Sequence, residues 1–286
     1  MSEETTEETY EDRTGETFEK VRLTDASFED VYLDGARFND VVLRGATLRE
    51  VDLRGLVARD VWLEDVDITA RIGNLRINGI DVAPYVEAEL DRLQPDRPKM
   101  RPTDAQGFRE AWDVVERLWG ETVDHARTFT PDQLHERIDG EWSFIETLRH
   151  LVFATDAWVC RALLGDPEPW DALDLPHDEM ADAPPVPRDR DARPTLDDVL
   201  ALRAERMGTV RRVVDELTDD ALAGTTEPVT DPGYPETGAY AVRRVLLTVL
   251  SEEWSHRQYA ERDLAVVAAR AAGLPDPEPA VGIPPR

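Results

Sequence analysis

A large apolar residue at every fifth position from Phe18 to Ile68 constrains the fold of this chain more than any other feature. Neither an α-helix nor a β-strand has a period of five residues. The centres of the repeat are Phe18, Leu23, Phe28, Leu33, Phe38, Leu43, Leu48, Leu53, Leu63 and Ile68, with Ala58 as the one small exception. Two residues after most centres comes a turn former, such as Asp25, Gly35 or Asp40. A chain with one inward apolar residue and one corner in every five residues is expected to wind into a coil, each winding burying the side chains of its neighbours.

The register of this repeat resembles that of the pentapeptide-repeat proteins. The resemblance implies a short right-handed quadrilateral β-solenoid, in which four pentads make one winding. Eleven centres give fewer than three windings, which is close to the minimum for a stacked core, so we expect the solenoid to pack against another part of the chain. Beyond the repeat, Leu75, Ile77 and Ile80 predict a last strand, with Asn78-Gly79 as a turn, and Pro84 predicts the start of a short helix. We therefore assign residues 16–95 to the repeat domain with its capping strand and helix.

Composition limits the partners and the compartment. The chain of 286 residues has a net charge of −28, with 61 Asp and Glu against 33 Lys and Arg, and this field repels nucleic acids and anionic membranes. The single cysteine, Cys160, forbids an internal disulfide, and we expect it to be a small core residue. The first residues lack the basic and apolar regions of a signal peptide, and no apolar run is long enough to span a bilayer. These observations predict a cytoplasmic protein with a disordered acidic tail at residues 1–15.

From Thr103 onward the apolar residues recur at helical spacing. Long amphipathic helices are predicted at residues 104–129 and 143–165, from residue 195 onward and at residues 240–273, with a short helix at 131–134. Four such helices predict a four-helix bundle over residues 104–273, preceded by a linker at 96–103 and followed by a Pro-rich tail at 274–286. Residues 165–194 and 218–238 form long connections rich in Pro and acidic residues, of a length typical of functional lids or disordered segments.

Two predicted helices carry polar residues where a bundle needs apolar ones. On the last helix, the apolar stripe through Val245 and Val249 continues with Glu252 and His256, which lie four residues apart on one face. On the second long helix, His150 lies among apolar residues. Two nitrogen ligands and one oxygen ligand from facing helices would hold one divalent ion and leave it open positions, as in catalytic metal sites.

Two segments around these residues resemble the signature segments of the DinB-like metal-binding four-helix superfamily. They are EWSFIETLRHLVFATDAW at 141–158 and SEEWSHRQYAERDL at 251–264, and the likeness spans roughly Pro102 to Arg270. The resemblance implies that one histidine of the second helix and a pair four apart on the last helix bind a divalent metal, usually zinc or nickel. His150 and His256 match this pattern, and Glu252 stands where the common pattern has histidine. Some members are transferases or isomerases that use the thiols bacillithiol or mycothiol.

Each candidate residue also has a purely structural interpretation. His150 and His256 could be hydrogen-bonded core histidines without a metal, and Glu252 could be a solvated helix residue. Glu253 lies about 100° round the helix from Glu252, where it could be a general base, although a surface role is the alternative. His177, in the first long connection, is a weaker candidate for a third nitrogen ligand. The residues that would bind an organic cofactor are not identified by the sequence.

The sequence thus predicts a multidomain β and all-α chain, a short β-solenoid followed by a DinB-like four-helix bundle. We favour a metal-dependent transferase or hydrolase that acts on a small electrophile, with zinc or nickel and a low-molecular-weight thiol as cofactors. The alternatives are an acidic interaction module that imitates a DNA duplex, as some pentapeptide-repeat proteins do against topoisomerases, and a metal-stabilised scaffold without turnover. The expected partners are a small-molecule substrate or thiol, with no nucleic acid and no membrane, and we also consider a homodimer.

Overall fold

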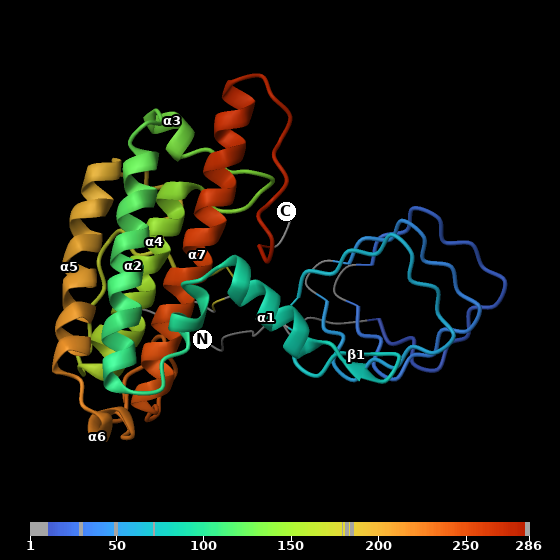
Figure 1. The fold of residues 1–286 in the computed structure, drawn as a ribbon, viewed down its shortest axis with the longest axis horizontal. Helices are drawn as coiled ribbons and strands as arrows, with labels where there is room; N and C mark the ends of the chain where they lie inside the picture. The colour runs from blue at the N-terminus through green and yellow to red at the C-terminus, as the bar shows by residue number, and fades with distance from the viewer. Residues whose placement is uncertain are drawn as a thin grey trace, which may run out of the picture. The chain divides into compact units, whose positions relative to one another are not determined.

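The computed structural model describes residues 11–28, 31–48, 51–70, 72–178, 180, 183 and 186–283. The chain divides into two compact units, Met1–Glu64 and Asp65–Arg286. All helices in the described part of the chain belong to the second unit (Figure 1). The division falls before the predicted capping strand and helix. Of the predicted disordered tail, residues 1–10 lie outside the described residues.

In the described part of the first unit the backbone turns at every fifth residue. Left-handed backbone conformations, with φ between 53° and 82°, occur at Gly15, Lys20, Asp25, Gly35, Asp40, Gly45, Gly55 and Asp60. Gly and Asp are among the residues that adopt this conformation most readily, which is why they recur at the corners. At every second corner the turn closes with a backbone hydrogen bond, for example from Ala36 N to Leu33 O at 3.0 Å. The predicted register of corners is therefore confirmed at the described positions.

The predicted packed interior of the repeat is not found. The large centres from Phe18 to Ile68 are 51–66% exposed, and the described residues of this unit contain no β-strand. Their backbone hydrogen bonds all lie within single turns, so none joins one winding to the next. Figure 1 shows these windings as open loops. Without hydrogen bonds between windings, the coil does not close tightly enough to cover its own centres, and the structure does not confirm a β-solenoid.

The predicted last strand is found as a pair of short strands, and the predicted turn and short helix are present. Strands β1 (Arg76–Ile77) and β2 (Ile80–Asp81) pair antiparallel around Asn78 and Gly79, which both have positive φ. Helix α1 (Ala83–Leu93) follows, with proline in its first turn. The predicted linker 96–103 is ordered and contains the 3₁₀-helix η1 (Arg97–Met100), which contacts α2 and α7. The Pro-rich and basic composition of residues 96–103 is typical of a linker. In the structure, however, Arg97 and Arg101 each bind Asp91 of α1 at 2.6 Å and so attach this segment to the helix.

Four long helices form the bundle. They are α2 (Ala105–Ala126), α4 (Phe144–Thr155) with its π-helical continuation η2 (Asp156–Leu163), α5 (Leu196–Glu216) and α7 (Val242–Ala271). Two short helices, α3 (Pro131–Leu134) and α6 (Asp219–Leu222), lie in the connections. Both α4 and α2 contact α5 and α7, and the four helices run side by side in Figure 1. Their cores meet at fully buried side chains such as Phe108, Trp112, Leu148, Leu246 and Leu264.

Local sequence signals explain where these helices begin. Ser143 and Thr195 accept hydrogen bonds from the third helical backbone N–H, and the side chains of Glu146 and Asp198 return the contact. These capping boxes satisfy backbone donors that would otherwise be unpaired at a helix start. The predicted start of the second long helix at Ser143 is thus confirmed, whereas its last two turns are π-helical. No helix in the described part of the chain is both long and apolar enough to cross a membrane.

Candidate metal centre

Helices α4 and α7 bring His150, Glu252 and His256 together. One ligand atom from each of these three residues lies within 4.8 Å of the others. The Nε2 atoms of His150 and His256 lie 3.5 Å and 3.0 Å from Oε2 of Glu252. Glu252 and His256 share a face of α7 because they are one helical turn apart, and the packing of α4 against α7 places His150 opposite them. The three residues selected from the sequence therefore form one cluster.

The cluster lies at the edge of the bundle core. His150 is only 6% exposed, whereas the side chains of Glu252 and His256 are 32% and 18% exposed. The cluster is therefore buried on the α4 side and reaches solvent on the α7 side. A group bound between the three side chains would be held by the core and could still exchange ligands with the solution.

A backbone carbonyl fixes the orientation of His150. The Nδ1 atom of His150 lies 2.9 Å from the carbonyl oxygen of Leu175, so Nδ1 carries the proton and Nε2 has a free lone pair facing Glu252. Leu175 belongs to the long connection after η2, and buried Arg149 holds this connection by donating to the carbonyls of Leu173 and Asp189. An imidazole whose second nitrogen donates to a carbonyl is the usual arrangement of a metal-binding histidine.

The protonation states of the cluster also suit a cation. Burial lowers the pKa of His150 and outweighs the opposing effect of nearby Glu252, so this imidazole stays neutral. Burial alone would raise the pKa of Glu252, but the two neighbouring imidazoles outweigh it and lower the pKa, so the carboxylate stays ionised. A neutral imidazole and an ionised carboxylate are the forms that bind metals.

Aromatic rings cover the two imidazoles. The ring centroid of Trp142 lies 4.5 Å from that of His150 and 5.9 Å from that of His256, to which it is nearly parallel. On the other side of His150, Phe153 lies at 5.9 Å, and Tyr259 meets His256 edge-on at 5.8 Å. The sequence analysis did not select Trp142, although its position just before the N-cap Ser143 places it about two helical turns from His150. These rings exclude water from the flanks of the cluster and hold both imidazoles in place.

Comparison with known families gives two matches. The sequence model of the DinB superfamily matches residues 114–260, a little more than half of the chain, and the range contains all three residues of the cluster. The chain belongs to the DinB superfamily. Eight pentapeptide repeats match residues 18–55, in agreement with the repeat identified from the sequence. Comparisons with curated proteins and with solved structures give no match.

The donor set of this DinB protein fits a divalent transition metal. Two imidazole nitrogens and one carboxylate oxygen converge from two helices, and proteins bind zinc, nickel, cobalt and ferrous iron with such sets. Members of the DinB superfamily are generally metal-binding helical proteins, and His150 and His256 lie within the range that its sequence model matches. Three protein ligands leave open coordination positions, which distinguishes a catalytic from a structural site.

Two further candidates from the sequence lie elsewhere. Glu253 is 1% exposed and forms a bidentate ion pair with Arg203 of α5, at 2.7 Å and 2.8 Å. With both oxygens engaged by a guanidinium in the core, Glu253 is neither a surface residue nor positioned as a general base for the cluster. His177 is not part of the three-residue cluster, and its ring meets Tyr234 edge-on at 5.5 Å. Cys160 is half-buried, and this burial raises the pKa of its thiol to about 12, as expected for an unreactive cysteine.

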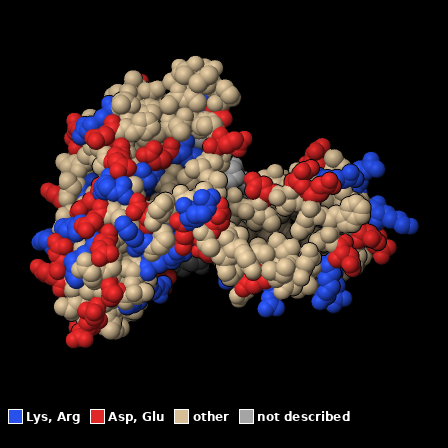
Figure 2. Space-filling view, viewed as in Figure 1, with Lys and Arg blue, Asp and Glu red and all other residues tan. Residues whose placement is uncertain are grey.

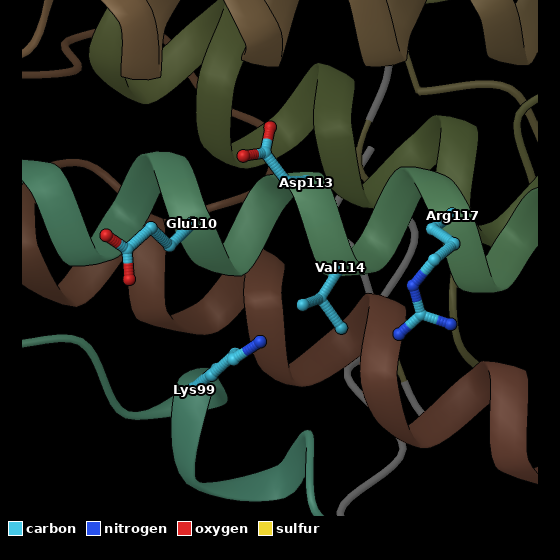
Figure 3. Close-up of a pocket in the computed structure, with 5 residues that line it drawn as sticks. All are labelled: Lys99, Glu110, Asp113, Val114 and Arg117. Atoms are coloured by element: carbon cyan, nitrogen blue, oxygen red, sulfur yellow. The ribbon is translucent and has the colours of Figure 1, made fainter.

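A surface pocket of the DinB unit lies away from the cluster. Its volume is about 350 Å³, and Figure 3 shows four of its lining residues on α2 with Lys99 of η1 opposite them. The lining residues are Lys99, Glu110, Asp113, Val114 and Arg117. Two cations and two anions leave this pocket without a net charge to select a ligand, and none of its residues belongs to the cluster.

Proposed function

We propose that this protein is a divalent-metal-dependent enzyme, a thiol transferase or hydrolase acting on a small electrophile. The observation that supports this proposal best is the convergence of the two Nε2 atoms and one carboxylate oxygen of His150, His256 and Glu252 within 4.8 Å. Zinc and nickel are the preferred ions, because imidazole suits both. A bound divalent ion lowers the pKa of a thiol or a water molecule and so supplies a nucleophile at neutral pH.

Residues around the cluster would orient the ligands, set the charge of the site and exclude water from it. Leu175 holds the proton of His150 on Nδ1 and keeps Nε2 available. The ionised Glu252 contributes one negative charge, so a divalent ion in this set keeps a net positive charge and attracts an anionic nucleophile. Trp142 and Phe153 shield the flanks of the cluster from water, which strengthens each electrostatic contact there.

The surface charge agrees with a small-molecule substrate. On the face of the helical unit shown in Figure 2, basic side chains are interspersed with acidic ones and form no continuous basic area. With a net charge of −28, the protein offers little attraction for nucleic acid or for an anionic membrane. A small thiol or electrophile needs only the local field of the cluster.

A test compares the metal content of variants of the full-length protein, purified without a histidine tag. We expect about one equivalent of zinc or nickel in the wild type, and none in His256→Ala, which loses a ligand. Glu252→Gln keeps the shape of the side chain but loses its charge, and should weaken binding by more than about tenfold. Glu252→His should strengthen it by supplying the ligand more common in the superfamily. His125→Ala is the matched control, since His125 lies on α2 outside the cluster.

The same variants define the result that would contradict the proposal. Equal and substoichiometric metal in the wild type and in His256→Ala would mean that the cluster holds no ion, and the enzyme proposal would be wrong. Zinc should also raise the melting temperature of the wild type and not of His256→Ala, because an ion that binds only the folded state stabilises it.

The repeat unit supports a second role. Its exposed apolar centres form a surface of the kind that mediates protein contacts, and the match to pentapeptide repeats covers residues 18–55. We propose that this unit is an interaction module whose exposed centres contact a partner; the alternative is that its windings close into the predicted four-sided β-solenoid and bury these centres. Backbone amide hydrogen exchange would test this, because a closed solenoid protects amides throughout residues 16–70, whereas open windings protect only those in turns.

A further inference from the structure

Tyr234 lies in the aromatic layer next to His150. Its ring centroid is 5.6 Å from that of Phe153, and Phe153 is itself 5.9 Å from His150 on the same helix. Tyr234 also meets Trp158 at 5.8 Å and His177 at 5.5 Å. Since Tyr234 belongs to the connection between α6 and α7 and His177 to the one after η2, the two long connections meet at this ring pair.

A buried arginine fixes the backbone that leads to Tyr234. The guanidinium of Arg161 donates to the carbonyls of Asp231 and Pro232 at 2.5 Å and 3.1 Å, and also to that of Pro167 in the other connection at 2.5 Å. Gly233 has φ +144°, and a Cβ atom there would lie 3.2 Å from Nη2 of Arg161. The close approach of guanidinium and backbone therefore requires glycine. The position of Tyr234 is set by the core of the bundle.

The hydroxyl group of Tyr234 makes no hydrogen bond to any residue that the structure describes. Tyr240, at the end of the same connection, differs in this respect, because its hydroxyl donates to the carbonyl of Glu236. Burial, and next the negative charge of Glu252, raise the pKa of Tyr234, so the phenol remains a proton donor at neutral pH. Tyr234 is thus fixed by three rings and a clamped backbone, it contacts Phe153, which in turn contacts His150, and its hydroxyl has no partner among the described residues.

We propose that Tyr234 donates a hydrogen bond to the small anionic ligand that occupies the open position of the metal centre. The proposal rests on the proposed function, because it needs an ion bound by His150, Glu252 and His256. The ligand would be a thiolate or hydroxide in the reaction, and any small anion of similar size could replace it. Tyr234 then favours an anion over a neutral molecule of equal size, because a hydrogen bond to a charged acceptor is stronger than one to a neutral acceptor.

The experiment uses full-length protein loaded with Co²⁺ and azide as the small anion. The visible absorption of Co²⁺ reports its stoichiometry and its coordination, and its change on titration gives the dissociation constant of azide. We compare wild type, Tyr234→Phe and Tyr240→Phe, which each lose one hydroxyl group and keep the ring. A hydrogen bond to an anion predicts that Tyr234→Phe binds azide about tenfold more weakly. Its Co²⁺ content should equal that of the wild type, and Tyr240→Phe should bind azide within about twofold of the wild type.

The two proposals fail in different ways in this experiment. Equal azide affinity in the wild type and Tyr234→Phe, each with one equivalent of Co²⁺, would overturn the role of Tyr234 and leave the metal centre intact. The same role is overturned if the wild type binds Co²⁺ but no azide. Failure of the wild type to bind stoichiometric Co²⁺ would contradict the metal centre, and the role of Tyr234 with it.

Discussion

Asp174 provides the sharpest test of the electrostatics of this fold. It lies in the connection that follows η2, next to Leu175, and it is fully buried. Its Oδ2 accepts a hydrogen bond from the backbone N–H of Asp171, whereas Oδ1 has no partner among the described residues. Burial, and next the charge of Asp156, raise the pKa of Asp174 from 3.8 to about 8. The carboxyl group is therefore protonated in the folded protein at neutral pH.

This pKa makes the stability of the wild type depend on pH. Between pH 3.8 and about 8, Asp174 is ionised in the unfolded chain and protonated in the folded one, so the folded state binds more protons. The free energy of unfolding must then fall as the pH rises through this window, and become constant above it. Because one pKa unit corresponds to about 1.4 kcal/mol, the contribution of Asp174 falls by about 3 kcal/mol between pH 5.5 and pH 8.

Asp174→Asn removes this titration and keeps the size of the side chain. The buried amide has its own cost of about 1–3 kcal/mol, but this cost does not change with pH. We expect the stability of the variant, relative to the wild type, to rise by about 3 kcal/mol from pH 5.5 to pH 8. Urea unfolding followed by far-ultraviolet circular dichroism, in the presence of a chelator, measures both free energies.

Asp124→Asn is the control, because Asp124 is exposed on α2. Its stability relative to the wild type should be constant over the same range of pH. A difference between Asp174→Asn and the wild type that is also independent of pH would show that Asp174 is already ionised in the folded state, and that water or another group reaches Oδ1. The assignment of a protonated carboxyl would then be wrong.

Two further predictions concern residues whose surroundings in the structure differ from those expected from the sequence. Glu253→Gln leaves the buried guanidinium of Arg203 without its counter-charge, so we expect a loss of about 3 kcal/mol in thermal unfolding with zinc content unchanged; loss of zinc at constant stability would instead make Glu253 part of the metal site. Leu43→Asp alters a side chain that is exposed, so it should change stability by less than about 0.5 kcal/mol. Rapid proteolysis of residues 11–64 in that variant would show that the centre is buried and the repeat closed.

The sequence by itself determined those features that depend on local interactions. The corners of the repeat follow from Gly and Asp at every fifth position, because few other residues accept a positive φ. The start of α4 follows from Ser143 and Glu146, which satisfy the first backbone donors of the helix. The grouping of Glu252 with His256 follows from their spacing of one helical turn. His150 could be selected because it is a polar residue among apolar ones, in a segment that resembles a signature segment of the superfamily.

Only the tertiary structure decided the partners of the polar residues. Glu252 and Glu253 are neighbours in the sequence, yet one faces two imidazoles and the other faces Arg203 of α5, because consecutive residues point about 100° apart around α7. The orientation of His150 depends on the carbonyl of Leu175, which a long connection returns to the bundle. Whether the repeat centres are covered likewise depends on hydrogen bonds between windings, which the period of five does not specify. Contacts between distant segments depend on how the whole chain packs, and no local pattern encodes that packing.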